Sequence, residues 1–271
     1  MATLKSLTEF EGTIGNITAY KRRDSDKTYL RTKGGASKKK IKKHKAFERT
    51  RELNAEWSGC AKAAALVRDL LYKQQSVVDY NLSGPLTAIA KNIQTRDVVH
   101  KKGERSVLFS SYGHVLEGFQ LNRKSSFESI IRGNVQVQLI REEAKAIVQL
   151  PELIPGISFL APVALPVFNI ALSFGTLPDL HFVDGGYSIH HENPQHIQLC
   201  TAYQTAWYYS ADTVAAQTVE LVLNNPLQMI PQDALALAIS VNFGNPVTNE
   251  LVKSVRYVGA GKLLKVVNAN Q

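Results

Sequence analysis

The alternation of large apolar residues with small or polar ones in the second half of the chain restricts its fold most. Residues 235–243 and 197–207 both alternate in this way over their whole length. Because a strand points successive side chains to opposite faces, a period of two indicates half-buried antiparallel strands. Turn-forming residues separate such stretches, among them Asp184-Gly185-Gly186 and Gly244-Asn245-Pro246. Residues 104–271 are therefore predicted to form an antiparallel β-sandwich, either jelly-roll-like or Ig-like.

A different period precedes these strands. Between Ala46 and Tyr72 the sequence has no proline and one glycine, and its apolar residues recur at steps of three or four. These residues are Phe47, Leu53, Trp57, Cys60, Ala64, Val67 and Leu71. The spacing predicts a long amphipathic helix with one apolar stripe. A second, shorter helix is predicted after Pro85, which suits a first helical turn. The predicted fold class is therefore α+β.

One uncharged stretch, Leu153 to Leu177, is long enough to span a bilayer as a helix. Pro155, Pro162 and Pro166 lie inside it, and each would remove a helix hydrogen bond and clash with the preceding turn. We therefore expect one or two buried or edge strands here and no membrane span.

The N-terminus and the cysteines indicate the location of the protein and limit its disulfide and zinc chemistry. The first twelve residues lack the apolar core and cleavage site of a signal peptide, which favours a cytoplasmic location. Cys60 and Cys200 are too few for a disulfide framework, and no CxxC pair is present for zinc. We expect no cofactor and no metal.

Positive charge is concentrated near the start of the chain. Residues 21–51 hold fourteen Lys or Arg against three acids, a net charge of +11, while the whole chain carries +9. Residues 12–33 are predicted to form a β-hairpin with the polar turn Arg23-Asp24-Ser25-Asp26. The densest part of the block, Lys38 to Lys45, is expected to lead into the long helix. A basic block on a near-neutral body is typical of proteins that meet a polyanion or an acidic partner.

The residues predicted to bind the polyanion are Arg22, Arg23, Arg31, Lys38, Lys39, Lys40, Lys42, Lys43, Lys45 and Arg49. Neutralising several phosphates releases counterions, so binding should depend strongly on salt. Lysine outnumbers arginine here, which favours contact with backbone phosphate, because bidentate recognition of bases favours arginine. Only Tyr20, Tyr29 and Phe47 lie near the block, so the sequence supports stacking on bases weakly. Nucleic acid and an acidic patch of a neighbouring copy both stay open as partners.

The histidine-rich segment from His190 to His196, with His181 and Asp184 nearby, is the best candidate for a metal site. Imidazole and carboxylate groups both bind zinc. However, no HExxH or comparable spacing is present, so an exposed loop between strands is the more ordinary interpretation. A metal-dependent hydrolase that uses His181, His190, His191 and Asp184 is kept as one alternative function.

Other catalytic signatures are missing from the sequence. Gly259-Ala260-Gly261-Lys262 resembles the end of a phosphate-binding loop, but Arg256 and Leu263 stand where that motif requires Gly and Ser or Thr. We interpret it as a turn. No G-x-S-x-G nucleophile motif is present. A second alternative function is a binding module that recognises a glycan or a protein through Tyr187 in the loop 184–196 and through Trp207-Tyr208-Tyr209.

Three N-terminal motifs carry a resemblance to other proteins: GTIGNITAYK from Gly12 to Lys21, YLRTKGG from Tyr29 to Gly35, and AFERTR from Ala46 to Arg51. Together with the segment Ser254 to Gly259, they resemble a family of uncharacterised bacterial proteins, mostly from Bacteroidetes. The resemblance implies a Gly-x-x-Gly hairpin, a return strand with Arg, a helix that opens with an Arg/Phe motif, and a β-rich remainder. It implies no function.

These patterns predict a basic hairpin-plus-helix module over residues 1–103 and an antiparallel β-sandwich over residues 104–271. The leading functional hypothesis is a non-enzymatic structural or assembly protein that forms a homo-oligomer. Its basic segment would contact nucleic acid or an acidic neighbouring subunit. Shell proteins that enclose nucleic acid also combine a basic segment with a β-sandwich, which is an analogy of fold alone.

Overall fold

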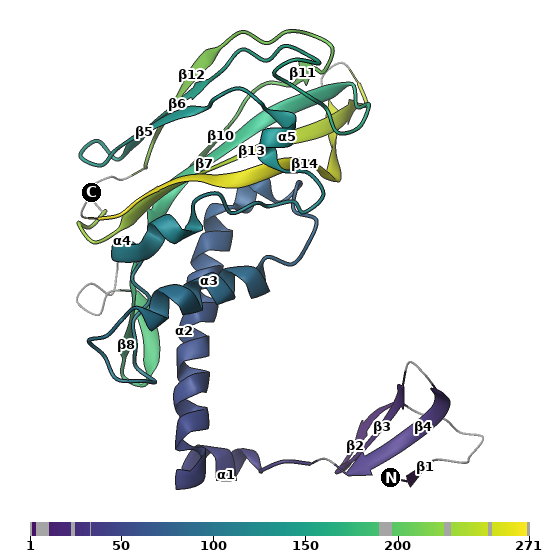
Figure 1. The fold of residues 1–271 in the computed structure, drawn as a ribbon, viewed down its shortest axis with the longest axis vertical. Coiled ribbons are helices and arrows are strands. Elements are labelled where there is room, and N and C mark those ends of the chain that lie inside the picture. The colour runs from purple at the N-terminus through teal and green to yellow at the C-terminus, as the bar shows by residue number, and fades with distance from the viewer. Residues whose placement is uncertain are drawn as a thin grey trace. The chain divides into compact units, whose positions relative to one another are not determined.

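The computed structural model describes residues 2–3, 11–22, 25–32, 34–189, 197–224, 229–248 and 251–269 (Figure 1). It has an N-terminal hairpin, a long helix and mostly antiparallel sheets in the C-terminal part, so the predicted α+β class is confirmed. The chain divides into two compact units, Met1–Arg51 and Glu52–Gln271. The boundary drawn from the sequence, between residues 103 and 104, falls inside the larger unit.

The N-terminal unit contains a four-stranded antiparallel sheet in the order β1-β4-β3-β2. Its strands are β1 (Ala2–Thr3), β2 (Gly12–Ile14), β3 (Ile17–Arg22) and β4 (Ser25–Thr32). The strands β3 and β4 form the predicted hairpin. Gly15 has a φ of +58°, a left-handed conformation that lets the chain turn tightly from β2 into β3. The sheet is followed by α1 (Lys38–Lys43), η1 (Lys45–Phe47) and the first residues of α2 (Glu48–Leu70).

The predicted long helix is present as α2, but its apolar stripe is buried only in its second half. Cys60, Ala64 and Val67 pack in the core of the larger unit, whereas Leu53 is 40% and Trp57 47% exposed. The predicted apolar stripe therefore meets the core only in the second half of the helix. The second predicted helix is α3 (Ser83–Thr95), which has Pro85 in its first turn as expected.

A five-stranded antiparallel sheet is the centre of the larger unit. It consists of β7 (Val167–Leu177), β10 (Cys200–Gln204), β11 (Tyr208–Tyr209), β13 (Ala234–Pro246) and β14 (Val252–Val267). The strands β10, β7, β13 and β14 lie side by side in that order, and β11 also pairs with β7.

The central strand β13 is buried on both faces, so its prediction as a half-buried strand is wrong. Its large residues at 235, 237, 239, 241 and 243 face a second sheet. Ala234, Ala236 and Ala238 belong to the core cluster on the other face, which also contains residues of α2 and α3, Phe109 and Leu116, and their small side chains let helices approach the sheet closely. The alternation reflects two different packing partners, and neither face of this segment meets water.

The second sheet has the order β12-β6-β5 and packs against the large residues of β7 and β13. Its strands are β5 (Gln136–Ile140), β6 (Lys145–Leu150) and β12 (Gln217–Val222). Figure 1 shows this sheet on one side of the five-stranded sheet and α3 on the other. The remaining elements are η2 (Tyr72–Gln74), α4 (Phe109–Tyr112), η3 (Gly113–Leu116), α5 (Phe127–Ile130), β8 (Leu180–Val183) and β9 (Gly186–Ile189).

The uncharged stretch between Leu153 and Leu177 ends in β7, whose eleven residues are all buried. The prediction of a buried strand is confirmed, because both faces of β7 are covered by the core. Within the part of the chain that the structure describes, no helix has the length and apolarity needed to cross a membrane.

Two segments predicted as turns belong to long strands. Gly244, Asn245 and Pro246 end β13, and Gly259-Ala260-Gly261-Lys262 lies in the middle of β14. The register between these strands shifts between Asn242 and Gly244, which marks a bulge. Gly259 has a φ of +103°, and a Cβ there would lie 2.1 Å from a backbone oxygen of β13. The glycines therefore allow a close approach of two strands and do not mark a chain reversal.

Candidate polyanion-binding site

The densest part of the basic block forms a helix of its own and does not simply lead into α2. The helix α1 begins where the Ser37 hydroxyl accepts a hydrogen bond from the Lys40 backbone N–H at 3.2 Å. Its sequence is Lys-Lys-Lys-Ile-Lys-Lys, and none of its residues is buried. Because a helical turn takes 3.6 residues, the five lysines are spread around the axis. Nearly the whole surface of α1 is therefore cationic.

The six lysines of this segment are exposed, and no acidic partner for them lies in the part of the chain that the structure describes. They are Lys38, Lys39, Lys40, Lys42, Lys43 and Lys45. Among the residues that the structure describes, no carboxylate forms an ion pair with any of them. A cluster of like charges without internal counterions attracts anions from outside.

Arg51 fixes α1 to the following helix. Its guanidinium donates hydrogen bonds to the carbonyl oxygens of Ile41 and His44, both at 2.9 Å. The bond to Ile41 satisfies a backbone oxygen that the end of a helix would otherwise leave unpaired, while the His44 oxygen also accepts from the Phe47 N–H at 3.1 Å. Lys45 in η1 and Arg49 at the start of α2 follow directly, so the basic surface continues beyond α1.

The two remaining described arginines lie on the β3–β4 hairpin beside two tyrosines. Tyr20 and Tyr29 are directly opposite in register, and their ring centroids are 5.9 Å apart in a stacked arrangement. The Arg22 guanidinium carbon lies 4.8 Å from the Tyr29 ring centroid, and that of Arg31 lies 5.4 Å from the Tyr20 centroid. Both arginines are exposed and both rings are half-buried. These four side chains are termed the Arg–Tyr ladder.

The predicted polyanion-binding residues thus form two groups within the N-terminal unit. The first follows the chain from Lys38 to Arg49 through α1, η1 and the start of α2. The second is the pair Arg22 and Arg31 in the Arg–Tyr ladder. Arg23 lies outside the described residues.

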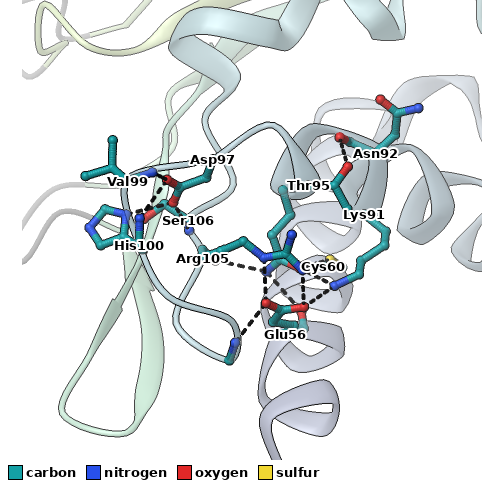
Figure 2. Close-up of polar contacts among 12 residues, drawn as sticks. Glu56, Cys60, Lys91, Asn92, Thr95, Asp97, Val99, His100, Arg105 and Ser106 are labelled. Carbon is teal, nitrogen blue, oxygen red and sulfur yellow. Dashed lines mark hydrogen bonds and ion pairs between the residues drawn. The ribbon is translucent and has the colours of Figure 1, made fainter. Parts of the chain in front are cut away.

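A buried polar cluster in the larger unit is the other place where a site could be sought (Figure 2). The Glu56 carboxylate is 1% exposed and accepts hydrogen bonds from Arg105 at 2.7 and 2.8 Å. It also accepts from the Gly103 backbone N–H at 2.9 Å and pairs with Lys91. Burial alone would raise the pKa of Glu56, but Arg105 and Lys91 lower it to about 2. A carboxylate held so firmly in its ionised form does not exchange protons near neutral pH.

The neighbours of Glu56 are equally occupied. The Gln94 side-chain oxygen accepts from the Cys60 thiol at 3.3 Å and from Lys91 at 2.8 Å. The Tyr187 hydroxyl donates to the Arg105 carbonyl at 2.7 Å and accepts from the Gln94 amide at 3.0 Å. Burial raises the pKa of the Cys60 thiol to about 11, so the thiol stays protonated and is a poor nucleophile. The cluster connects α2, α3 and β9.

Asp97 orders the loop that leads into this cluster. Its carboxylate accepts from the backbone N–H groups of Val99, His100 and Ser106, and it pairs with the His100 ring at 2.7 Å (Figure 2). Burial opposes ionisation of Asp97, but these hydrogen bonds lower its pKa below the ordinary value. The Ser106 hydroxyl lies 3.3 Å from a His181 ring nitrogen, yet Ser106 is 1% exposed. A hydroxyl buried in this way is not presented to a substrate.

The metal candidates of the sequence are only partly described. His181 is in β8 beside Ser106, and Asp184 is in the turn between β8 and β9. His190 and His191 lie outside the described residues. No group of three or more metal-ligating side chains occurs in the described ranges.

The aromatic residues proposed for a binding module differ in their surroundings. Tyr187 is buried, and its hydroxyl belongs to the Glu56 cluster. Tyr208 packs on Phe168, with ring centroids 5.7 Å apart. Trp207 is half-buried, and Tyr209 is exposed at the end of the sheet.

Comparison with known proteins gave no matching family profile, no matching curated protein and no matching solved structure. The resemblance to uncharacterised Bacteroidetes proteins therefore stays a prediction.

The Arg–Tyr ladder escaped the sequence analysis, although its signal is present. Tyr20 and Tyr29 are each followed two positions later by Arg, at Arg22 and Arg31. Only the strand register, which pairs Tyr20 with Tyr29, shows that each arginine crosses to the tyrosine of the other strand. The Glu56 cluster carries no such local signal, because its members come from four distant segments.

Proposed function

We propose that this chain is a non-enzymatic structural protein whose basic N-terminal unit binds nucleic acid. The observation that carries the proposal is the row of exposed lysines from Lys38 to Lys45, which lacks acidic partners among the described residues. Nucleic acid presents closely spaced phosphates at a density that suits such a row, and the released counterions favour binding.

The charge of the rest of the chain favours nucleic acid over an acidic neighbouring copy. Residues 52–271 hold 17 basic and 18 acidic residues, a net charge of −1. A second copy therefore brings no excess of negative charge to meet the +10 of residues 1–51. An external polyanion supplies that charge without requiring a special patch.

The Glu56 and Asp97 clusters of the larger unit support a non-enzymatic role. The Glu56 and Asp97 carboxylates are ionised and saturated with donors, and Cys60 is a buried, protonated thiol. General acid–base or nucleophilic chemistry needs a group whose proton or lone pair is accessible near neutral pH.

Self-association into a homo-oligomer is part of the proposal. Val98 and Val99 are adjacent and are 90% and 85% exposed. Apolar side chains presented to water gain free energy when another surface covers them. These two residues are the first place at which we would look for contacts between copies.

The test is size-exclusion chromatography with light scattering, recording the 260/280 nm absorbance ratio at low and high salt. The variant carries Lys→Gln at 38, 39, 40, 42 and 43. The control carries five Lys→Gln changes on exposed lysines of the larger unit: Lys73, Lys101, Lys102, Lys124 and Lys253. Both proteins lose the same charge, so only its place in the chain differs.

Wild-type and control protein should elute as assemblies with nucleic-acid absorbance that high salt removes, while the α1 variant should elute free of nucleic acid. Assemblies that lack nucleic acid would overturn the nucleic-acid proposal and favour an acidic neighbouring subunit. A clean monomer would contradict the assembly proposal.

A further inference from the structure

We infer that the Arg–Tyr ladder of the N-terminal hairpin binds the bases of single-stranded nucleic acid. The inference rests on the proposed function, and it adds the form of the nucleic acid and the residues that contact its bases. The ladder consists of Arg31, Tyr20, Tyr29 and Arg22, as defined above.

The strand register builds the ladder from a repeated Tyr-x-Arg pattern. Residues two apart on a regular strand lie on the same face, so Tyr29 shares a face with Arg31. The register shifts between Lys21 and Arg22, so the position of Arg22 beside the Tyr29 ring comes from their distance and not from the alternation. Because Tyr20 pairs with Tyr29 and the strands are antiparallel, each arginine lies diagonally across from the opposite tyrosine. The distances of 4.8 and 5.4 Å from guanidinium to ring show that both diagonal pairs, Arg22 with Tyr29 and Arg31 with Tyr20, lie within cation–π range.

This arrangement presents flat groups to bases. A base stacks on an aromatic ring or on the plane of a guanidinium. In the ladder the two rings stack on each other and each lies beside a guanidinium, so one row holds two groups of each kind. The rings are half-buried rather than covered, and Arg22 and Arg31 are exposed. The ladder also stabilises the hairpin, because a cross-strand aromatic pair does so in any small sheet.

Single-stranded nucleic acid is the occupant that this chemistry selects. In a duplex the base faces are stacked on one another inside the helix, so only an unpaired strand can place them against Tyr20 or Tyr29. The guanidinium groups of Arg22 and Arg31 add positive charge at the same place, which complements the phosphates of that strand. The lysines of α1 attract phosphate whether or not bases are present.

Two probes separate stacking from charge: a short oligothymidine and an abasic oligonucleotide of the same length. They carry equal phosphate charge and differ only in the bases. Binding of each fluorescently labelled probe to the full-length chain is followed by anisotropy at fixed salt. We expect tighter binding of oligothymidine, by about tenfold for each base that stacks.

Three variants locate the effect. Tyr20→Leu with Tyr29→Leu removes the rings, whereas Tyr20→Phe with Tyr29→Phe keeps them. The control, Tyr203→Leu with Tyr209→Leu, removes two exposed rings of the larger unit. The Leu pair should lose the preference for oligothymidine, and the Phe pair and the control should keep it. Binding of the abasic probe should be unchanged in all three.

A crosslinking measurement needs no variant and so does not depend on the hairpin folding after substitution. Ultraviolet light would be applied to wild-type chain bound to oligo-4-thiothymidine, and the crosslinked peptides mapped by mass spectrometry. Crosslinks at Tyr20 or Tyr29 are expected. Equal affinity for the two probes, with crosslinks elsewhere, would overturn the inference and leave the proposed function standing. Failure to bind either probe would overturn both.

Discussion

In the larger unit the Glu56 carboxylate is buried and meets Arg105, Lys91 and a backbone N–H. In the N-terminal unit the lysines of α1 are exposed and have no acidic partner in the described ranges. The first charge is balanced within the fold and holds helices and strand together. The second has no counterpart among the described residues of the chain. Net charge alone therefore says little about function, because a charge that is already paired within the fold does not attract a partner.

The largest loss of unfolding free energy should follow from removing the Glu56 carboxylate, which pairs with Arg105 and Lys91. Glu56→Gln leaves the cations of Arg105 and Lys91 facing a neutral amide, and we expect the larger unit to lose about 4 kcal/mol of unfolding free energy. Chemical denaturation at neutral pH would measure the loss. Both tryptophans, Trp57 and Trp207, belong to the larger unit, so their fluorescence reports its unfolding alone.

The matched control is Glu104→Gln. Glu104 pairs with Lys101 at 3.0 Å, but both side chains are solvent-exposed, so the loss should stay below about 1 kcal/mol. Losses of equal size in the two variants would show that the burial of Glu56 contributes nothing.

The second prediction concerns the pH dependence of stability, which Asp179 should control. Asp179 is a buried carboxylate whose only hydrogen-bond donors among the described groups are neutral. Burial raises its pKa to about 6, although Ser110 donates to it through backbone and hydroxyl at 2.8 and 2.5 Å. In the unfolded chain the group titrates near 3.8. Between pH 4 and 6 the folded state therefore holds a proton that the unfolded state has released, and stability falls as pH rises.

This pH dependence amounts to about 2 kcal/mol between pH 4 and 6. Asp179→Asn removes the titrating group, so wild-type chain should lose about that much more stability than the variant over this interval. Denaturation of both proteins at several pH values would measure the difference. Parallel stability curves would contradict the account of Asp179.

The smallest effect is expected at α1. Replacing Lys38, Lys39, Lys40, Lys42 and Lys43 with Gln should change the unfolding free energy of the larger unit by less than about 0.5 kcal/mol, because exposed charges without partners contribute little to stability. Tryptophan fluorescence again follows the transition. A loss of more than about 1 kcal/mol of unfolding free energy would contradict this expectation, since the lysines would then stabilise the fold.

Local patterns in the sequence were enough to predict the α+β class, the helices α2 and α3, and the buried strand β7. They failed where burial depends on a distant partner. The alternation in β13 could not show that its alanines face a helix, and the glycines of 259–261 could not be distinguished from a turn. Leu53 and Trp57 follow helical spacing but lie beyond the reach of the core.

The candidate site shows the same limit. The lysines of α1 were identified because charge is visible residue by residue. The Arg–Tyr ladder depends on a register that pairs Tyr20 with Tyr29, and the Glu56 cluster depends on Arg105, which lies 49 positions away in the chain. Neither arrangement can be deduced without knowing which strands and helices pack together.

The most direct test of the central claim is the salt dependence of nucleic-acid affinity, compared between wild-type chain and the variant with five Lys→Gln changes in α1. For a single strand, the slope of log affinity against log salt is about −0.7 for each phosphate that is neutralised. We predict a steep slope for the wild-type chain and one about 3.5 shallower for the α1 variant, with the control of five lysines in the larger unit behaving as wild type. Equal slopes for the α1 variant and wild type would show that the lysines of α1 do not contact phosphate, and this result would contradict the proposed function.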